Sequence, residues 1–208
     1  MNKPTPPFLT SGLILVLIGI HFLVPDKSAF YFTAENIAQG ELWRLVTGHL
    51  VHADLQHLGW NCLGLLVLGT LIEQYSKAAW WAAIIAGIAS VDVLLFSPFS
   101  QLYYYCGLSG VLNTLLVVVL WLEWRRTRSW LVIAITLGAV AKAVIEVASG
   151  ESLLTHINWP PYAWSHVAGL IGGVLVILTH RKTRYLLHHG NENPDPAILT
   201  PGIGSLAD

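Results

Sequence analysis

The chain has 208 residues, of which 54% are hydrophobic and only 11% are charged. A soluble domain carries about 25% charged residues, so this composition excludes an ordinary soluble protein and indicates an integral membrane protein. The net charge of −1 argues against nucleic acid as a partner, because nucleic-acid-binding surfaces need an excess of basic residues.

Membrane-spanning helices are expected wherever about 20 consecutive residues are mostly apolar. The first apolar run continues to Val24 and meets Pro25-Asp26 rather than a small-residue cleavage site, so we interpret it as a retained helix and not as a signal peptide. The sequence thus predicts an all-α polytopic membrane protein, a bundle of six transmembrane helices that span roughly residues 8–24, 54–74, 78–97, 109–124, 129–148 and 164–180. The residues expected to cap helix ends are Asp54, Ser129 and Gly150.

The basic residues predict the orientation of this bundle. Lys27 and Arg44 fall on one side, and most others fall on the opposite side: Lys3, Lys77, Arg125, Arg126, Arg128, Arg181, Lys182 and Arg184. Because basic residues are enriched in cytoplasmic segments, both termini are predicted to be cytoplasmic. We assign residues 1–185 to the membrane domain and the polar, Gly- and Pro-rich residues 186–208 to a cytoplasmic tail that is predicted to be disordered.

Ser109 is the first residue that suggests chemistry, because it opens the fourth predicted helix between Gly107 and Gly110. Glycines there permit a tight turn and a close backbone approach. A hydroxyl at a helix N-terminus lies beside free backbone N–H groups, which favour a developing oxyanion. The alternative interpretation is an ordinary serine cap after a glycine turn.

His166 begins the sixth predicted helix, and Gly169 and Gly173 follow it. An imidazole in an apolar helix is costly and is usually functional or paired. Glycines three and seven residues later leave a smooth face on which another helix can pack closely. If that helix is the fourth, His166 meets Ser109, and the two form a nucleophile and its base. The alternative is a packing motif with an incidental histidine.

His57 and Asn61 differ by about 40° around the second predicted helix and so share one face. Two neutral donors on one face can hold an oxyanion, or they can simply bond neighbouring helices. His52 precedes the Asp54 cap and is expected to pack the loop before this helix. A metal site is the rival interpretation, but the spacing lacks the two histidines four residues apart, with a glutamate between them, of zinc proteases. We therefore predict no metal and no cofactor.

Lys142 and Glu146 lie four residues apart in the fifth predicted helix. Either charge alone would cost several kcal/mol in lipid, so we interpret them as a mutually neutralising pair that faces the bundle. A contact for the substrate or for an acyl acceptor is the alternative. Asp92 in the third predicted helix is a further acid with no obvious partner.

Together these residues resemble the rhomboid family of intramembrane serine proteases. The motifs occur in the family's order: Trp43-Arg44, His52-x4-His57-x3-Asn61, Gly107-x-Ser109-Gly110 and His166-x2-Gly169-x3-Gly173. The resemblance implies a Ser109–His166 dyad without an acid. It also implies an oxyanion site made by His57, Asn61 and the Ser109 backbone N–H, with His52 in support.

The chain looks most like the rhombosortase branch of this family, from its compact size, its Gly-Leu-Ser-Gly-Val-Leu run and its Ala141-Lys142-x3-Glu146 pattern. This likeness implies a bacterial inner-membrane protease with a periplasmic active site. Its partners would be lipids and exported proteins anchored by a C-terminal GlyGly-CTERM signal, which it would cleave, with hydrolysis or transfer to another nucleophile as outcomes.

Two positions depart from the rhomboid pattern. Ser165 stands where the family often has alanine, which is a small change, and the other position is that of Asn113. Classical rhomboids often carry an aromatic ring four residues after the serine, where this chain has Asn113. We hypothesise that Asn113 orients His166 by a hydrogen bond instead. Alternative functions are a general rhomboid protease with other single-pass substrates, a non-catalytic rhomboid-like binder of membrane helices, and a small transporter or channel.

Overall fold

The computed structural model describes residues 6–100, 102–150 and 162–189, with side chains described as far as Thr179. These residues are nearly all helical and contain no strand, only an isolated bridge between Phe32 and Tyr105. The α-helices are α1 (Phe8–Leu23), α2 (Ala34–Ala38), α3 (Arg44–Leu50), α4 (Leu55–Tyr75), α5 (Lys77–Leu95), α6 (Ser109–Thr127), α7 (Trp130–Ser149) and α8 (Ala163–His189), and a short 3₁₀ helix covers Ser28–Phe30.

Internal contacts divide the chain into two units, Met1–Ile177 and Leu178–Asp208. The second unit is described only to His189, where it continues α8. Helix α8 therefore extends four residues beyond the predicted domain boundary at residue 185. The rest of the predicted tail, residues 190–208, lies outside the described residues. Every contact discussed below lies within the first unit.

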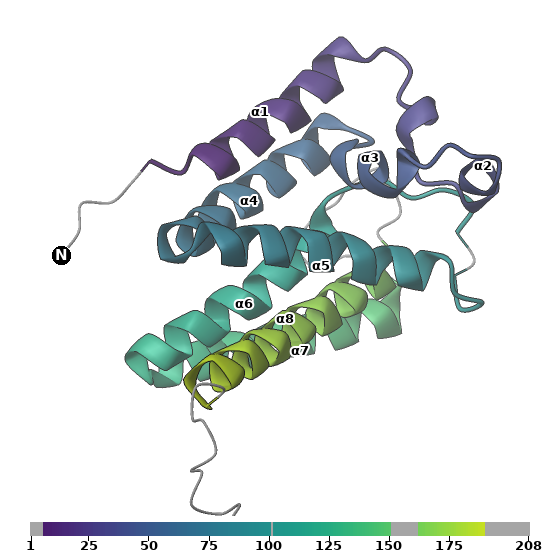
Figure 1. Cartoon of the computed structure of the whole chain (residues 1–208). Coiled ribbons are helices and arrows are strands. Elements are labelled where there is room, and N and C mark those ends of the chain that lie inside the picture. Colours follow the sequence, from purple (N-terminus) through teal and green to yellow (C-terminus); the bar gives the residue numbers. More distant parts are fainter. Residues whose placement is uncertain (1–5, 101, 151–161, 190–208) are drawn as a thin grey trace, which may run out of the picture. The chain divides into compact units, whose positions relative to one another are not determined.

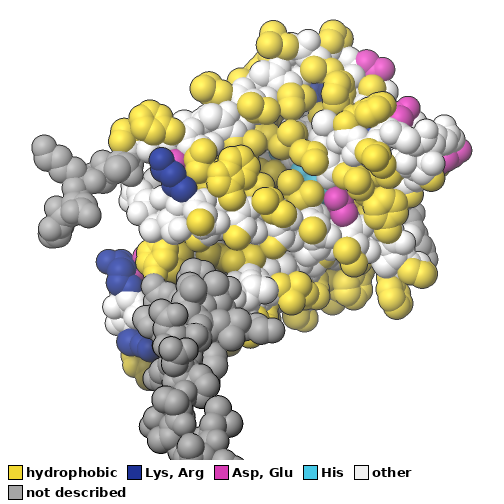
Figure 2. Space-filling model, in the orientation of Figure 1, with side chains coloured by type: hydrophobic (Ala, Val, Ile, Leu, Met, Phe, Trp, Pro, Cys, Tyr) yellow, Lys and Arg dark blue, Asp and Glu magenta, His cyan; other side chains and the backbone are white. Residues whose placement is uncertain are grey.

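Each of the six predicted membrane segments contains a helix. By length and composition, α4, α5 and α7 are long and apolar enough to cross a membrane, whereas α1 and the Ala163–Thr179 part of α8 are shorter apolar helices. A helix rises 1.5 Å per residue, so the 20 residues of α7 match a hydrocarbon core of about 30 Å. Figure 2 shows hydrophobic side chains over most of the face in view, as expected of an integral membrane protein.

The helices begin and end at the predicted caps. The Asp54 carboxylate accepts a hydrogen bond of 2.7 Å from the backbone N–H of His57 at the start of α4. The Ser129 hydroxyl accepts one of 3.2 Å from Leu131 at the start of α7. Gly150 closes α7 with a φ of 72°, a left-handed conformation that favours glycine.

Helices α4, α5 and α6 pack on one another, α1 lies along α4, and α7 contacts α6 (Figure 1). The core between them is apolar, with Leu65, Ile72, Trp80, Val111 and Leu115 almost completely buried. Because α6 lies at the centre of these contacts, its first residue, Ser109, has a well-supported position.

A buried carboxylate fastens α1 to this core. Glu73 of α4 accepts hydrogen bonds from the backbone N–H groups of Leu9 and Thr10, at 2.9 and 2.8 Å, and from the Thr10 hydroxyl. Trp80 of α5 donates to that same hydroxyl at 3.1 Å. Glu73 thus satisfies backbone donors at the N-terminus of α1, where a negative charge is also favoured by the helix dipole.

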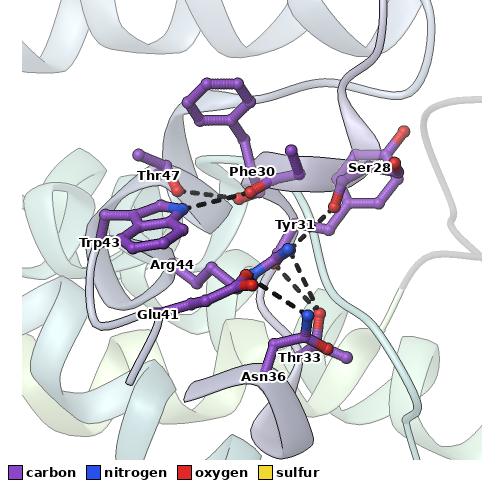
Figure 3. A network of polar contacts seen from close by, with 10 residues as sticks. Ser28, Phe30, Tyr31, Thr33, Asn36, Glu41, Trp43, Arg44 and Thr47 are labelled. Carbon is purple, nitrogen blue, oxygen red and sulfur yellow. Dashed lines mark hydrogen bonds and ion pairs between the residues drawn. The ribbon is translucent and has the colours of Figure 1, made fainter. Parts of the chain in front are cut away.

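The segment between α1 and α4, for which the sequence analysis predicts no helix, folds around Arg44 (Figure 3). Arg44 is 6% exposed, and its guanidinium donates to the Ser28 and Tyr31 carbonyls at 2.8 Å each and forms an ion pair with Glu41. Thr47 donates to the Phe30 carbonyl at 2.9 Å. These bonds hold the 3₁₀ helix to α3. Phe32 and Ile37 of the same segment pack in an apolar cluster with residues of α5.

Candidate active site

Helix α3 and the turn before Ser109 are joined by backbone contacts. Gly107 donates to the Gly48 carbonyl at 2.9 Å, and Phe32 exchanges two backbone hydrogen bonds of 3.0 Å with Tyr105. A methyl group on Gly48 would come within 2.9 Å of the Phe32 backbone nitrogen. The folded loop around Arg44 is therefore part of the support for the turn that carries Ser109.

The turn before Ser109 requires glycine. Gly107 has a φ of 116°, which side-chain-bearing residues rarely adopt. A Cβ atom there would also lie 2.5 Å from the imidazole ring of His57. One added to Gly110 would lie 2.6 Å from a methyl of Val91. The two glycines predicted to permit a close approach thus let α4 and α5 pack tightly on either side of Ser109.

Helix α8 packs directly on the backbone of α6. A Cβ atom on Gly169 would lie 1.9 Å from the Gly110 carbonyl oxygen, and one on Gly173 would lie 2.5 Å from Cβ of Val117. The Thr114 hydroxyl donates to the Gly169 carbonyl at 2.7 Å. The two glycines after His166 therefore face α6, the packing partner that the sequence analysis requires for a meeting with Ser109.

This packing brings His166 to Ser109. Nε2 of His166 lies 3.1 Å from Oγ of Ser109, within hydrogen-bond distance. His166 is buried, and Ser109 is the first residue of α6. A buried imidazole beside a serine hydroxyl at a helix N-terminus is an arrangement suited to nucleophilic catalysis.

An acid lies on the other side of the imidazole. Nδ1 of His166 is 3.0 Å from Oε2 of Glu146, and Oε1 of Glu146 accepts a hydrogen bond of 2.6 Å from Lys142. The resemblance implies a serine–histidine dyad without an acid, and the geometry here differs from it. The sequence analysis pairs Glu146 with Lys142 but misses the contact to His166. A carboxylate in a helix as apolar as α7 is the signal that a further partner exists.

Asn113 uses its amide within its own helix. It donates to the Ser109 carbonyl at 2.9 Å. The structure therefore does not support the hypothesis that Asn113 orients His166 by a hydrogen bond. Among the described residues, the side chain bonded to the second nitrogen of His166 is that of Glu146.

His57 and Asn61 are both buried, and the His57 ring lies against Gly107 in the Ser109 turn. The Asn61 amide donates to the His57 carbonyl at 3.0 Å. Nδ1 of His57 is buried and has no hydrogen-bond partner among the residues that the structure describes. This nitrogen is therefore available to a group that enters the site.

His52 lies in the loop before α4, with its ring edge-to-face against His57 at a centroid distance of 4.9 Å. Burial, reinforced by the neighbouring His57, lowers the pKa of His52 to about 3. His52 is thus neutral at physiological pH and packs against His57 as an uncharged ring.

His49 and Asp92 are each other's partners. Nε2 of His49, which is completely buried in α3, lies 3.1 Å from Oδ1 of Asp92 in α5. The sequence analysis left Asp92 without a partner because the two residues are far apart in the chain. His49 is therefore engaged with an acid, and within the described ranges no group of three or more His, Cys, Asp or Glu residues has an arrangement that suits a metal ion.

Cys106 is a further nucleophile near the site, three residues before Ser109. Burial raises the pKa of its thiol to about 12. Because the thiolate is the reactive species, this raised pKa disfavours Cys106 as a nucleophile at neutral pH.

Comparisons with known proteins agree with these motifs. The family model for the Rhomboid domain matches residues 39–183. Rhomboid protease GluP of Bacillus subtilis is 31% identical over 140 residues, which are 66% of this chain but 26% of GluP, so the chain spans about a quarter of that relative. YdcA of the same organism is 27% identical over 181 residues, 82% of this chain and 86% of YdcA. Rhomboid protease AarA of Providencia stuartii is 32% identical over 108 residues, 46% of this chain and 38% of AarA.

The matched range contains helix α3 with Arg44, the Ser109 turn and the first part of α8, which the geometry joins. This chain belongs to the rhomboid family.

Proposed function

We propose that this protein is an intramembrane serine endopeptidase in which Ser109 is the nucleophile and His166 is its base. The observation that carries the proposal is the 3.1 Å distance between Oγ of Ser109 and Nε2 of His166. The relatives that are named rhomboid proteases support it.

The reaction is acyl transfer. His166 takes the hydroxyl proton as Ser109 attacks the substrate carbonyl, and the protonated imidazole then gives that proton to the leaving amine. The new ester between Ser109 and the substrate is broken by water, or by an amine if the acyl group is transferred. No cofactor takes part in either step.

The negative oxygen that forms during attack needs donors. We assign this role to His57, Asn61 and the backbone N–H of Ser109, supported by the contact between the His57 ring and Gly107. The N-terminus of α6 adds a partial positive charge at the same place. Donors that are already positioned in a buried site stabilise such a charge strongly.

The proposed topology has six membrane crossings, α1 and α4 to α8, with both termini in the cytoplasm. Ser109, His57 and His166 all lie in the first turns of their helices, α6, α4 and α8. Lys77 begins α5 just after the C-terminal end of α4, and Arg125 and Arg126 lie in the last turn of α6. These basic residues are therefore at the opposite ends of α4 and α6 from His57 and Ser109. By the positive-inside rule, the site then opens to the periplasmic side of a bacterial inner membrane.

The proposed substrates are exported proteins held in the membrane by a C-terminal GlyGly-CTERM signal. Glycines at the cleavage site would make the substrate helix easy to unwind, since glycine weakens a helix. Unwinding exposes the backbone carbonyl that Ser109 must attack. The alternative is a general rhomboid protease with other single-pass substrates.

Co-expression with a secreted protein that carries a GlyGly-CTERM tail tests this proposal. Wild type should remove the tail, Ser109→Ala should not, and Ser11→Ala, which alters an exposed serine of α1 outside the site, should act like wild type. Mass spectrometry of the new C-terminus then separates hydrolysis from transfer. Equal processing by wild type and Ser109→Ala would contradict the proposed nucleophile.

Two further measurements, cleavage of a general rhomboid substrate and solute flux in liposomes, separate the alternatives. Failure to cleave this substrate, together with Ser109-dependent cleavage of a general rhomboid substrate, would indicate the general protease. Failure on both substrates by a correctly inserted protein would favour the non-catalytic binder, and solute flux in liposomes would identify a transporter.

A further inference from the structure

We infer that Glu146 completes the site as a positioning residue, so that Ser109, His166 and Glu146 form a triad whose carboxylate is held by Lys142. This inference rests on the proposed function, because it assigns a role to Glu146 in the same reaction. It differs from the acid-free dyad that the family resemblance implies.

The hydrogen-bond partners determine where the protons lie. An ammonium group can only donate, so Oε1 of Glu146 accepts from Lys142 at 2.6 Å. An ionised carboxylate can only accept, so Nδ1 of His166, 3.0 Å from Oε2, carries a hydrogen. The lone pair of the neutral ring is then on Nε2, 3.1 Å from Oγ of Ser109. Glu146 therefore selects the tautomer in which His166 can accept the serine proton.

The same contact stabilises the reaction's charged state. When the hydroxyl proton moves to Nε2 of His166, the imidazolium keeps its Nδ1–H directed at the Glu146 carboxylate. The proton stays on the imidazole and passes from there to the leaving amine, so Glu146 is unchanged at the end of each step. A carboxylate with this geometry stabilises the imidazolium without taking a proton itself.

Burial separates this role from simple neutralisation of Lys142. Only two residues of α7 are buried, Ala143 and Glu146, and Glu146 is 1% exposed. The Lys142 side chain is 34% exposed. A pair that served only to neutralise charge would not need its acid at the most buried position of the helix, against the ring nitrogen opposite Ser109. Moving an ion out of water is costly, which makes a role in the site the better explanation.

The decisive variants differ in what they leave behind. Glu146→Gln keeps the shape but leaves Lys142 without its counter-charge, and its amide can donate to Nδ1 and so favour the wrong tautomer. The double variant Lys142→Met, Glu146→Gln removes both charges together and therefore avoids an unpaired ion in the membrane. Glu146→Asp keeps the carboxylate on a shorter side chain. Glu123→Gln is the matched control, because Glu123 pairs with Arg126 at the surface of α6.

Each variant is measured as full-length protein in liposomes by the rate at which a fluorophosphonate probe labels Ser109. This probe needs no knowledge of the substrate, since the serine oxygen bonds to phosphorus and fluoride leaves. We expect Glu146→Gln and the double variant to lower the maximal labelling rate by about 10²–10⁴-fold, with little change in the probe concentration at half-maximal rate. Glu146→Asp should recover part of the rate, and Glu123→Gln should match wild type.

A spectroscopic signature provides a readout that folding alone would not change. In protein with ¹⁵N-labelled histidine, His166 should show the Nδ1–H tautomer in wild type and in Ser109→Ala, and should lose it in the double variant. Double-variant labelling within about threefold of wild type, with the tautomer retained, would overturn the inference while leaving Ser109 and His166 as proposed. Labelling that persists in Ser109→Ala would instead overturn the proposed function.

Discussion

Three histidines between the first loop and the Ser109 turn are buried: His49, His52 and His57. Their rings have different contacts. His49 contacts the carboxylate of Asp92, whereas His52 and His57 contact each other edge-to-face. A ring nitrogen without a partner costs free energy when it is buried. Both nitrogens of His52 lack a hydrogen-bond partner in the part of the chain that the structure describes, so this residue favours the neutral state.

The depressed pKa of His52 predicts a pH-dependent stability. The folded value is about 3 and the unfolded value is about 6.5, so below about pH 6.5 the unfolded chain binds a proton that the folded chain excludes. His52 therefore destabilises the fold increasingly as the pH falls from about 6.5 towards 3, by roughly 1–2 kcal/mol between pH 7 and pH 5. We expect thermal unfolding in detergent to depend less on pH in His52→Phe than in wild type. Parallel pH dependences of the two proteins would contradict this.

At the scale of helices, the approach of α8 to α6 depends on two glycines. Gly169→Ala should destabilise the protein by about 1–3 kcal/mol and abolish probe labelling of Ser109, because the added methyl group overlaps the Gly110 carbonyl. Gly138→Ala is the matched control, since a Cβ atom on Gly138 of α7 meets nothing within 4 Å. Wild-type stability and labelling in Gly169→Ala would show that α6 and α8 do not pack as described.

The attachment of α1 depends on Glu73. Glu73→Gln should lower the free energy of unfolding by about 1–3 kcal/mol, because a neutral amide replaces the carboxylate that caps α1. Glu123→Gln should change it by less than about 1 kcal/mol, since exposed ion pairs contribute little. Denaturant titration of both variants in detergent is the measurement, and similar losses in the two would argue against the cap.

At the scale of the whole molecule, the described site lies entirely within the unit Met1–Ile177. A protein that ends at His189 should therefore insert and label Ser109 at the wild-type rate. The comparison requires equal amounts of membrane-inserted protein, measured by immunoblotting of the membrane fraction. Loss of labelling by a stably inserted truncation would give the residues after His189 a role in the site.

Patterns local in the sequence predicted the elements of this molecule. Apolar runs of about 20 residues predicted the segments that contain α1 and α4 to α8, because the bilayer demands that length. The caps at Asp54, Ser129 and Gly150 were predictable because a cap bonds to backbone within a few residues. The Lys142–Glu146 contact was also predictable, since residues four apart share a helix face.

The fold of the first loop was beyond such patterns. Its short helices are held by one buried guanidinium that binds carbonyls 13 and 16 residues earlier in the chain. No periodicity in the sequence marks contacts of this kind, so the sequence indicated Arg44 as part of a family motif but did not predict the helices around it.

The sequence by itself determined the membrane class of the protein, the positions of its apolar helices and the motifs that identify its family. Only the tertiary structure decided that His166 lies between Ser109 and Glu146, and that Asp92 pairs with His49. The physical reason is the same for each contact. A hydrogen bond between helices depends on how closely and at what rotation they pack. Contacts such as that of Gly169 on Gly110 set both, and the glycine spacing along α8 predicts a close-packing face without specifying its partner or the rotation.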